Sequence, residues 1–174
     1  MFERLKLVTN SKIKKPISRK WFVVYILPIY ALFIGLFIAQ PWIGIVNKNL
    51  SGSLPQKYFW TSFFNKNVAK GDLVTFYSKL EGLEGDMIIK IVGGVAGDLV
   101  TVKDEKVYIN DRLIGGFKKA YFNKKLVTPI NKDMVIPKGK IFVYTPHAFS
   151  LDSRYQEMGL IDRKQILGRA YGIY

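Results

Sequence analysis

The hydrophobic positions of this 174-residue chain follow two different patterns, which divide it near residue 40. From Trp21 to Ala39 no charged residue occurs, and apolar side chains would cover every face of a helix, which argues against a buried core helix with one apolar stripe. The run is close to the roughly 20 residues that cross the hydrocarbon core of a bilayer. It therefore predicts a single membrane-spanning helix over residues 21–40.

A cleavable signal peptide is the main alternative for this apolar run. Such peptides have a shorter apolar core of roughly 7–15 residues, followed by a small-x-small cleavage sequence. The run here is longer, and Ile38-Ala39-Gln40-Pro41 is a poor cleavage sequence. Trp21 and Trp42 bracket the run, as aromatic residues at a membrane interface do. We therefore expect a retained anchor.

Beyond the long apolar run, segments with a period of two and short apolar runs dominate, separated by Gly, Asn and Asp. They predict a mainly β domain of coiled antiparallel sheets on the single N-terminal membrane helix. Residues 115–139 predict a loop-rich insert to which the sequence assigns no role. The expected strands are 73–77, 87–92, 99–102, 106–109, 112–114, 140–144 and 165–171, with turns at Asp104-Glu105 and Asn110-Asp111.

Charge predicts the orientation of the chain across the membrane. Residues 1–20 contain seven Lys or Arg against one acid, Glu3, and basic segments beside a membrane helix stay in the cytoplasm. We therefore expect a basic cytoplasmic segment 1–20, the membrane helix 21–40, and a domain 41–174 outside the cytoplasm. The chain contains no cysteine, so burial and not disulfides must stabilise that domain.

The net charge of +14 also raises the question of nucleic-acid binding. After Trp21, however, the basic residues are scattered, with only short pairs such as Lys118-Lys119 and Lys124-Lys125. A solvated surface beside anionic lipid head groups explains such a distribution more simply. We therefore expect membrane lipid, and no nucleic acid, among the partners.

The candidate chemistry is carried by three short segments that follow the apolar run. Together they contain a serine hydroxyl that could attack a carbonyl and a lysine amine that could accept its proton. The three segments are Ser51-Gly52-Ser53-Leu54-Pro55, Ile88-Ile89-Lys90-Ile91-Val92-Gly93 with Gly97-Asp98, and Ser150-Leu151-Asp152-Ser153-Arg154-Tyr155.

Lys90 interrupts a run that is otherwise apolar on both faces, which predicts a central strand. On such a strand Ile88 and Val92 share its face. Burial would lower the pKa of the amine from about 10.4, because it disfavours the ammonium form, and a lysine must lose its proton to act as a base. The alternative is an edge-strand lysine that prevents the sheet from pairing with other chains.

In this order the three segments resemble those of the membrane-bound type I signal peptidases, the serine–lysine proteases that cut exported precursors. The resemblance extends from about Asn49 to Ala170. Only Leu54 separates the candidate serine, Ser53, from Pro55. This spacing is similar to that of the branch that serves conjugative transfer (the TraF-type peptidases). The segment from Lys90 to Asp98 lacks the arginine and proline of the family pattern.

The resemblance implies a catalytic pair in which Ser53 is the nucleophile and Lys90 is the general base. It further implies an oxyanion hole formed by the Ser51 hydroxyl and the Ser53 N–H, in a loop whose turn Gly52 permits. Ser150 corresponds to a hydroxyl that positions the lysine amine.

Asp152 and Arg154 correspond to a family pair that braces the site without reacting. From the residues alone, Asp152-Ser153-Arg154 is equally typical of a turn with a weak surface ion pair. His147 lies close to Ser150, but a lone loop histidine is more often structural or solvated, and no metal cluster surrounds it. Neither a metal nor another cofactor is expected.

The function implied by the resemblance is that of a serine endopeptidase anchored by a single pass in a bacterial inner membrane. The implied substrate is an exported precursor, such as a pilin or another component of a conjugative transfer or type IV secretion apparatus. A general type I signal peptidase and a non-catalytic assembly subunit with the same fold are alternatives. A DNA-binding relative with a Ser-Lys self-cleavage site is a third, against which the expected membrane anchor argues.

Overall fold

A computed structural model of the chain describes residues 19–118 and 121–173. It divides into two units, residues 1–39 and residues 40–174, which we describe separately. Most of the expected cytoplasmic segment 1–20 lies outside the described residues. The second unit is mainly β, as the alternating pattern predicts.

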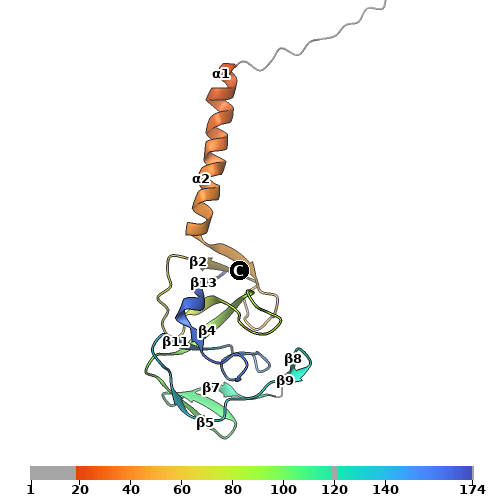
Figure 1. Cartoon of the computed structure of the whole chain (residues 1–174), viewed down its shortest axis with the longest axis vertical. Coiled ribbons are helices and arrows are strands. Elements are labelled where there is room, and N and C mark those ends of the chain that lie inside the picture. Colours follow the sequence, from red (N-terminus) through yellow and green to blue (C-terminus); the bar gives the residue numbers. More distant parts are fainter. Residues whose placement is uncertain (1–18, 119–120, 174) are drawn as a thin grey trace, which may run out of the picture. The chain divides into compact units, whose positions relative to one another are not determined.

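A helical run made of consecutive elements begins in the first unit and ends at Ile43, a few residues past its boundary: α1 (Arg19–Trp21), the π-helical turn η1 (Phe22–Ile26) and α2 (Leu27–Ile43) (Figure 1). Pro28 lacks a backbone N–H and crowds the preceding turn, which accounts for a widened turn directly before it. The segment predicted as one helix over 21–40 is thus helical throughout but divided by η1. Over the residues that the structure describes, no helix has both the length and the hydropathy of a membrane span.

A seven-stranded antiparallel sheet forms the main part of the described second unit, in the order β1-β2-β13-β3-β4-β11-β12. A short 3₁₀ helix, η2 (Arg163–Gln165), precedes β13. The strands are β1 (Ile45–Lys48), β2 (Tyr58–Ser62), β3 (Leu73–Tyr77), β4 (Met87–Val95), β11 (Lys140–Tyr144), β12 (Ile161–Asp162) and β13 (Ile166–Ile173).

A second, four-stranded sheet has the order β10-β5-β6-β7, and Figure 1 shows β5 and β7 at the end of this unit opposite to β2 and β13. Its strands are β5 (Leu99–Lys103), β6 (Lys106–Ile109), β7 (Arg112–Gly116) and β10 (Met134–Val135). The expected turns at 104–105 and 110–111 are confirmed. All four turn residues have positive φ, which Asn and Asp tolerate better than most residues.

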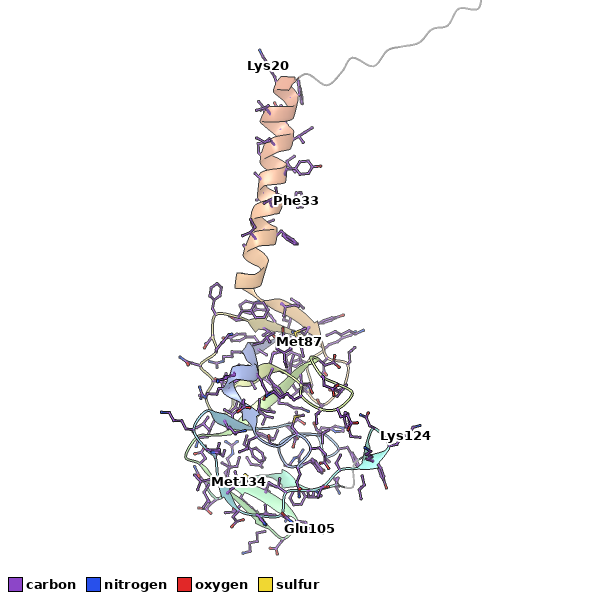
Figure 2. All side chains as sticks on the ribbon, viewed as in Figure 1. Lys20, Phe33, Met87, Glu105, Lys124 and Met134 are labelled. Carbon is purple, nitrogen blue, oxygen red and sulfur yellow. The ribbon has the colours of Figure 1, made fainter. Side chains whose placement is uncertain are left out.

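The insert 115–139 is less irregular than its sequence predicts. Besides β10, it contains a two-stranded hairpin, β8 (Tyr121–Phe122) and β9 (Lys125–Leu126). Its turn residues Asn123 and Lys124 have positive φ, and Figure 2 shows Lys124 at the outer end of the hairpin.

Two clusters of buried apolar side chains form the core of the second unit. The first lies against β3, β4 and β11, and the second lies between the two larger sheets. The first includes Val74, Phe76, Val92 and Val143; the second includes Val100, Val107, Ile109, Ile136 and Phe142.

The structure differs from the predicted strands mainly at β4 and β2. β4 continues through Gly93 and Gly94, because Phe142 of β11 pairs with Gly94 and Ile109 of the second sheet packs closely over it. β2 was missed because one inward position is a threonine. Thr61 is fully buried, and its hydroxyl forms a 2.7 Å hydrogen bond with that of Thr75, so it does not continue an apolar alternation.

Candidate active site

The candidate nucleophile lies in the loop between β1 and β2. Gly52 has φ +61°, a left-handed conformation that glycine adopts without strain, and it turns the chain between the two serines. The Asn49 side chain stabilises this loop, because its Nδ2 donates to the carbonyls of Leu54 at 2.8 Å and Gln56 at 3.0 Å. The loop is therefore held by hydrogen bonds on both sides of Ser53.

The two hydroxyls of this loop contact each other directly. Ser51 Oγ and Ser53 Oγ are 2.8 Å apart, and the Ser53 N–H donates to Ser51 Oγ at 3.4 Å. The Ser51 hydroxyl also donates to Asn49 Oδ1 at 3.2 Å. A substrate carbonyl oxygen bound at this point could accept hydrogen bonds from the Ser51 hydroxyl and the Ser53 N–H. Both donors would first have to break the hydrogen bonds that they form in this structure.

Lys90 lies at the centre of β4, and its side chain is only 6% exposed. β3 and β11 flank β4 on either side, so the edge-strand interpretation of this lysine is wrong. Lys90 Nζ donates to Ser150 Oγ at 2.6 Å. The structure thus joins two of the three sequence segments through a hydrogen bond between buried groups.

The environment of Lys90 shifts its protonation equilibrium towards the neutral amine. Burial lowers the pKa of Lys90 from its ordinary value of 10.5 to about 8, because it removes the ammonium from water. The carboxylate of Asp152 opposes this shift, and the guanidinium of Arg154 adds to it. About half of the amines are therefore neutral at pH 8 and about a tenth at pH 7.

Asp152 and Arg154 form a buried ion pair, with side chains 0% and 2% exposed. Arg154 donates from Nε and Nη2 to the two carboxylate oxygens, at 2.8 Å and 2.7 Å. Its remaining donors reach the carbonyls of Gly116, Thr145 and His147. The interpretation as a weak surface pair is therefore wrong, and the pair ties the segment that carries Ser150 to β7.

His147 is exposed, and its side chain lines the same cleft as Lys90. Its Nδ1 accepts a hydrogen bond from the Phe149 N–H at 3.3 Å, and its carbonyl accepts from Arg154. Among the described residues, no group of His, Asp or Glu side chains is arranged to hold a metal ion.

Ser51, Ser53, Lys90 and Ser150 line one cleft of about 410 Å³. In the described part of the chain, no hydrogen bond joins Ser53 Oγ to Lys90 Nζ, since Ser53 contacts Ser51 and Lys90 contacts Ser150. Most of the remaining lining is apolar. It includes Leu54, Leu80, Leu83, Ile88, Phe122 and Phe149.

Sequence reasoning missed Phe122 as part of the cleft. Phe122 belongs to the hairpin β8–β9 in the insert, 32 positions after Lys90, and no pattern in the insert indicates a position beside Lys90. Asn123, a residue type that favours turns, is a sequence signal that could have indicated the hairpin, but not its place in the fold.

Comparison with known proteins shows the family to which the chain belongs. The family model described as "Signal peptidase, peptidase S26" matches residues 18–174. The chain is 27% identical over 115 residues to signal peptidase I U of Bacillus subtilis (strain 168), a match that covers 63% of this chain and 57% of that protein. The crystal structure of a signal peptidase I from Enterococcus faecalis V583 is 22% identical, with a TM-score of 0.40, and covers 60% of this chain and 97% of that one.

Proposed function

This chain belongs to the signal peptidases of the peptidase S26 family, and we propose that it is a serine endopeptidase that uses Ser53 and Lys90 to cut exported precursor proteins. The observation that carries the proposal is the state of Lys90. Its buried amine has a pKa of about 8 and lines the same cleft as the Ser53 hydroxyl. A general base works best when its pKa lies near the working pH, and this lysine meets that condition.

In the first half of the proposed reaction, Ser53 Oγ attacks the carbonyl carbon of the scissile peptide bond while neutral Lys90 takes its proton. The charge that develops on the carbonyl oxygen is stabilised by the Ser53 N–H and the Ser51 hydroxyl. The resting contact of 2.8 Å between the two hydroxyls supports this role, because it places Ser51 next to the attacking atom.

In the second half, the tetrahedral intermediate expels the amine of the departing segment. The Lys90 ammonium donates its proton to that amine, and the precursor remains bound to Ser53 as an ester. Neutral Lys90 then removes a proton from a water molecule, whose oxygen attacks the ester carbonyl carbon. When the bond from that carbon to Ser53 Oγ breaks, the Lys90 ammonium returns the proton to Ser53 Oγ, which restores the hydroxyl and releases the cut segment as a carboxylic acid. Ser150 keeps the amine oriented throughout, through the 2.6 Å hydrogen bond that it accepts from Lys90.

We further propose that residues 21–40 anchor the enzyme by a single pass in a bacterial inner membrane, with the β unit outside the cytoplasm. The absence of charge between Trp21 and Ala39 and the basic residues before it support this proposal. Anionic lipid at the membrane surface would attract the basic residues of the β unit. We expect the protein to stay with the membrane after extraction at alkaline pH.

For the substrate, we propose a pilin or another precursor of a conjugative transfer apparatus. The support is the short spacing between Ser53 and Pro55, with Leu54 alone between them, which resembles the conjugative branch of the family. If the chain is a general signal peptidase instead, it will process many unrelated exported precursors in the same cells.

Mass spectrometry of a candidate pilin, produced with and without this chain, tests the proposal directly. The wild-type chain should release one defined mature form, and Ser53→Ala should release none while it accumulates to the same level. Ser51→Ala should retain a residual rate, lower by about 10²–10³-fold, because it removes one donor from the oxyanion hole. If the chain were a non-catalytic assembly subunit, the pilin would have the same mass with Ser53→Ala as with the wild type.

A further inference from the structure

The hairpin β8–β9 contributes Phe122 to the cleft, and its tip is tied to the loop between β3 and β4. Asn123 Nδ2 donates to the Glu81 carbonyl at 2.6 Å. Leu80, which neighbours Glu81, also lines the cleft. The hairpin is therefore held at its tip.

Phe122 is the residue by which this hairpin contributes to the cleft wall. It packs, together with Leu151, against the buried pair Val127 and Tyr155. Leu151 directly follows Ser150, whose hydroxyl binds the candidate base. The preceding residue of the same strand, Tyr121, is 70% exposed and does not line the cleft.

We propose that Phe122 determines specificity, by limiting the size of an apolar substrate side chain that binds next to the Lys90–Ser150 contact. This inference rests on the proposed peptidase function and names one wall of its substrate site. The substrate class to which this inference applies is an unfolded peptide with an apolar residue near the cleavage site.

The cleft offers little freedom on the side of Phe122. Phe122 and Leu151 pack against the same buried pair, and Leu54, Leu80 and Ile88 line the same cleft. The aromatic ring packs against the cluster that contains Tyr155, and the tip of the hairpin that carries it is tied by a hydrogen bond. Packed interiors yield little to an oversized group, so a bulky substrate side chain would meet a fixed surface.

Truncation of Phe122 should therefore enlarge the range of peptides that are cut. The purified full chain would be incubated with a mixture of peptides randomised around a central position, and cleavage sites would be identified by mass spectrometry. For Phe122→Ala we expect peptides with a larger side chain at one position beside the cleavage site to be cut more efficiently. Their kcat/KM relative to peptides with a small side chain should rise by roughly 10–200-fold, the range by which a pocket separates substrates of different size. Phe122→Leu should shift the same position by less and remains informative if the alanine variant does not fold.

Tyr121→Ala is the matched control, because it removes an aromatic ring from the same strand at an exposed position. Its cleavage profile should equal that of the wild type. Unchanged profiles for both Phe122 variants would overturn the inference and leave the proposed function intact. A wild-type chain that cuts none of the peptides while Ser53→Ala behaves identically would overturn the proposed function, and this inference with it.

A second pair of variants tests the hydrogen bond at the hairpin tip. Asn123→Gly removes the side chain that binds the Glu81 carbonyl, yet glycine adopts the positive φ of 49° at this position without strain. Lys124→Gly, at φ 63° in the same turn, is the control. We expect only Asn123→Gly to relax selectivity, at the same position as Phe122→Ala. Equal profiles for the two glycine variants would show that the tip hydrogen bond does not position Phe122.

Discussion

At the scale of single residues, Lys90 meets two opposing demands. The core of the β unit disfavours charge, yet the proposed mechanism needs an amine in the cleft that can accept a proton from Ser53. Burial lowers the pKa of Lys90 to about 8, Asp152 opposes the shift, and Arg154 adds to it. Because Asp152 is paired with Arg154, the carboxylate can lie near the amine without holding it permanently in the ammonium form.

The pH dependence of cleavage should follow the protonation of Lys90. Only the neutral amine accepts a proton, so kcat/KM should rise about tenfold per pH unit below a pH of about 8 and level off above it. Lys90→Arg should be inactive across this range, because a guanidinium does not deprotonate in proteins. Cleavage of a purified precursor between pH 6 and 10 measures both. Full activity of Lys90→Arg would exclude Lys90 as the base.

Lys90 should also lower the stability of the fold below pH 8. Its pKa falls from 10.5 when unfolded to about 8 when folded, so the unfolded chain binds more protons between these values and stability rises with pH across that window. A shift of this size corresponds to about 3 kcal/mol. Lys90→Met should therefore be more stable than the wild type by up to about 3 kcal/mol at pH 7, and the difference should vanish towards pH 10.5.

Urea unfolding at pH 7 and pH 10 measures this difference. Lys103→Met, an exposed position on β5, is the control and should change stability little at either pH. If Lys90→Met were less stable than the wild type at pH 7, Lys90 would contribute more through its hydrogen bond to Ser150 than its burial costs.

At the scale of elements, the buried ion pair fastens the segment after β11, which carries Ser150, to the end of β7. Arg154 reaches the carbonyl of Gly116 in β7, and the carboxylate of Asp152 binds both Arg154 and the Thr145 N–H. The segment would otherwise have to hold Ser150 against Lys90 by loop contacts alone. The pair therefore joins the two larger sheets at the candidate site.

Asp152→Asn should destabilise the protein by about 3–5 kcal/mol, because it leaves the Arg154 guanidinium buried without its counter-charge. The midpoint of the pH profile of the remaining activity should move to lower pH. The Asp152 carboxylate raises the pKa of Lys90, so its loss lets that pKa fall further. Urea unfolding and the pH profile of cleavage are the two measurements. Asp111→Asn, in an exposed turn at φ 64°, should change stability by less than about 0.5 kcal/mol.

At the scale of the whole molecule, the chain combines the charge-free segment Trp21–Ala39 with a basic β unit. The proposed orientation predicts that a periplasmic reporter enzyme, fused after Tyr174, is active, whereas a reporter that works only in the cytoplasm is inactive at the same position. Activity measured in intact cells tests this. Replacing the basic residues before Trp21 with glutamine is the control, and it should weaken the preference. An active cytoplasmic reporter would contradict both the topology and the proposed compartment.

The sequence by itself determined the features that depend on neighbouring residues. Period-two alternation and short apolar runs predicted β3, β6 and β11 with their observed bounds, although the central residues of β3 and β11 turn out to be buried on both faces. Asp104-Glu105 and Asn110-Asp111 predicted two turns, because Asp and Asn tolerate the backbone conformation that such turns need. The three motif segments predicted which residues belong to the candidate site, because the resemblance to family motifs depends only on the order of residues along the chain.

Only the tertiary structure decided what surrounds those side chains. Whether Lys90 lies at an edge or in the interior depends on β11, which pairs with β4 from about 50 positions further along the chain. The burial of Asp152 with Arg154 depends on β7, and the cleft wall at Phe122 depends on Tyr155 and the Glu81 carbonyl. Desolvation and packing are sums over atoms close in space. No local pattern encodes them, and they set the pKa of Lys90 and the shape of the cleft.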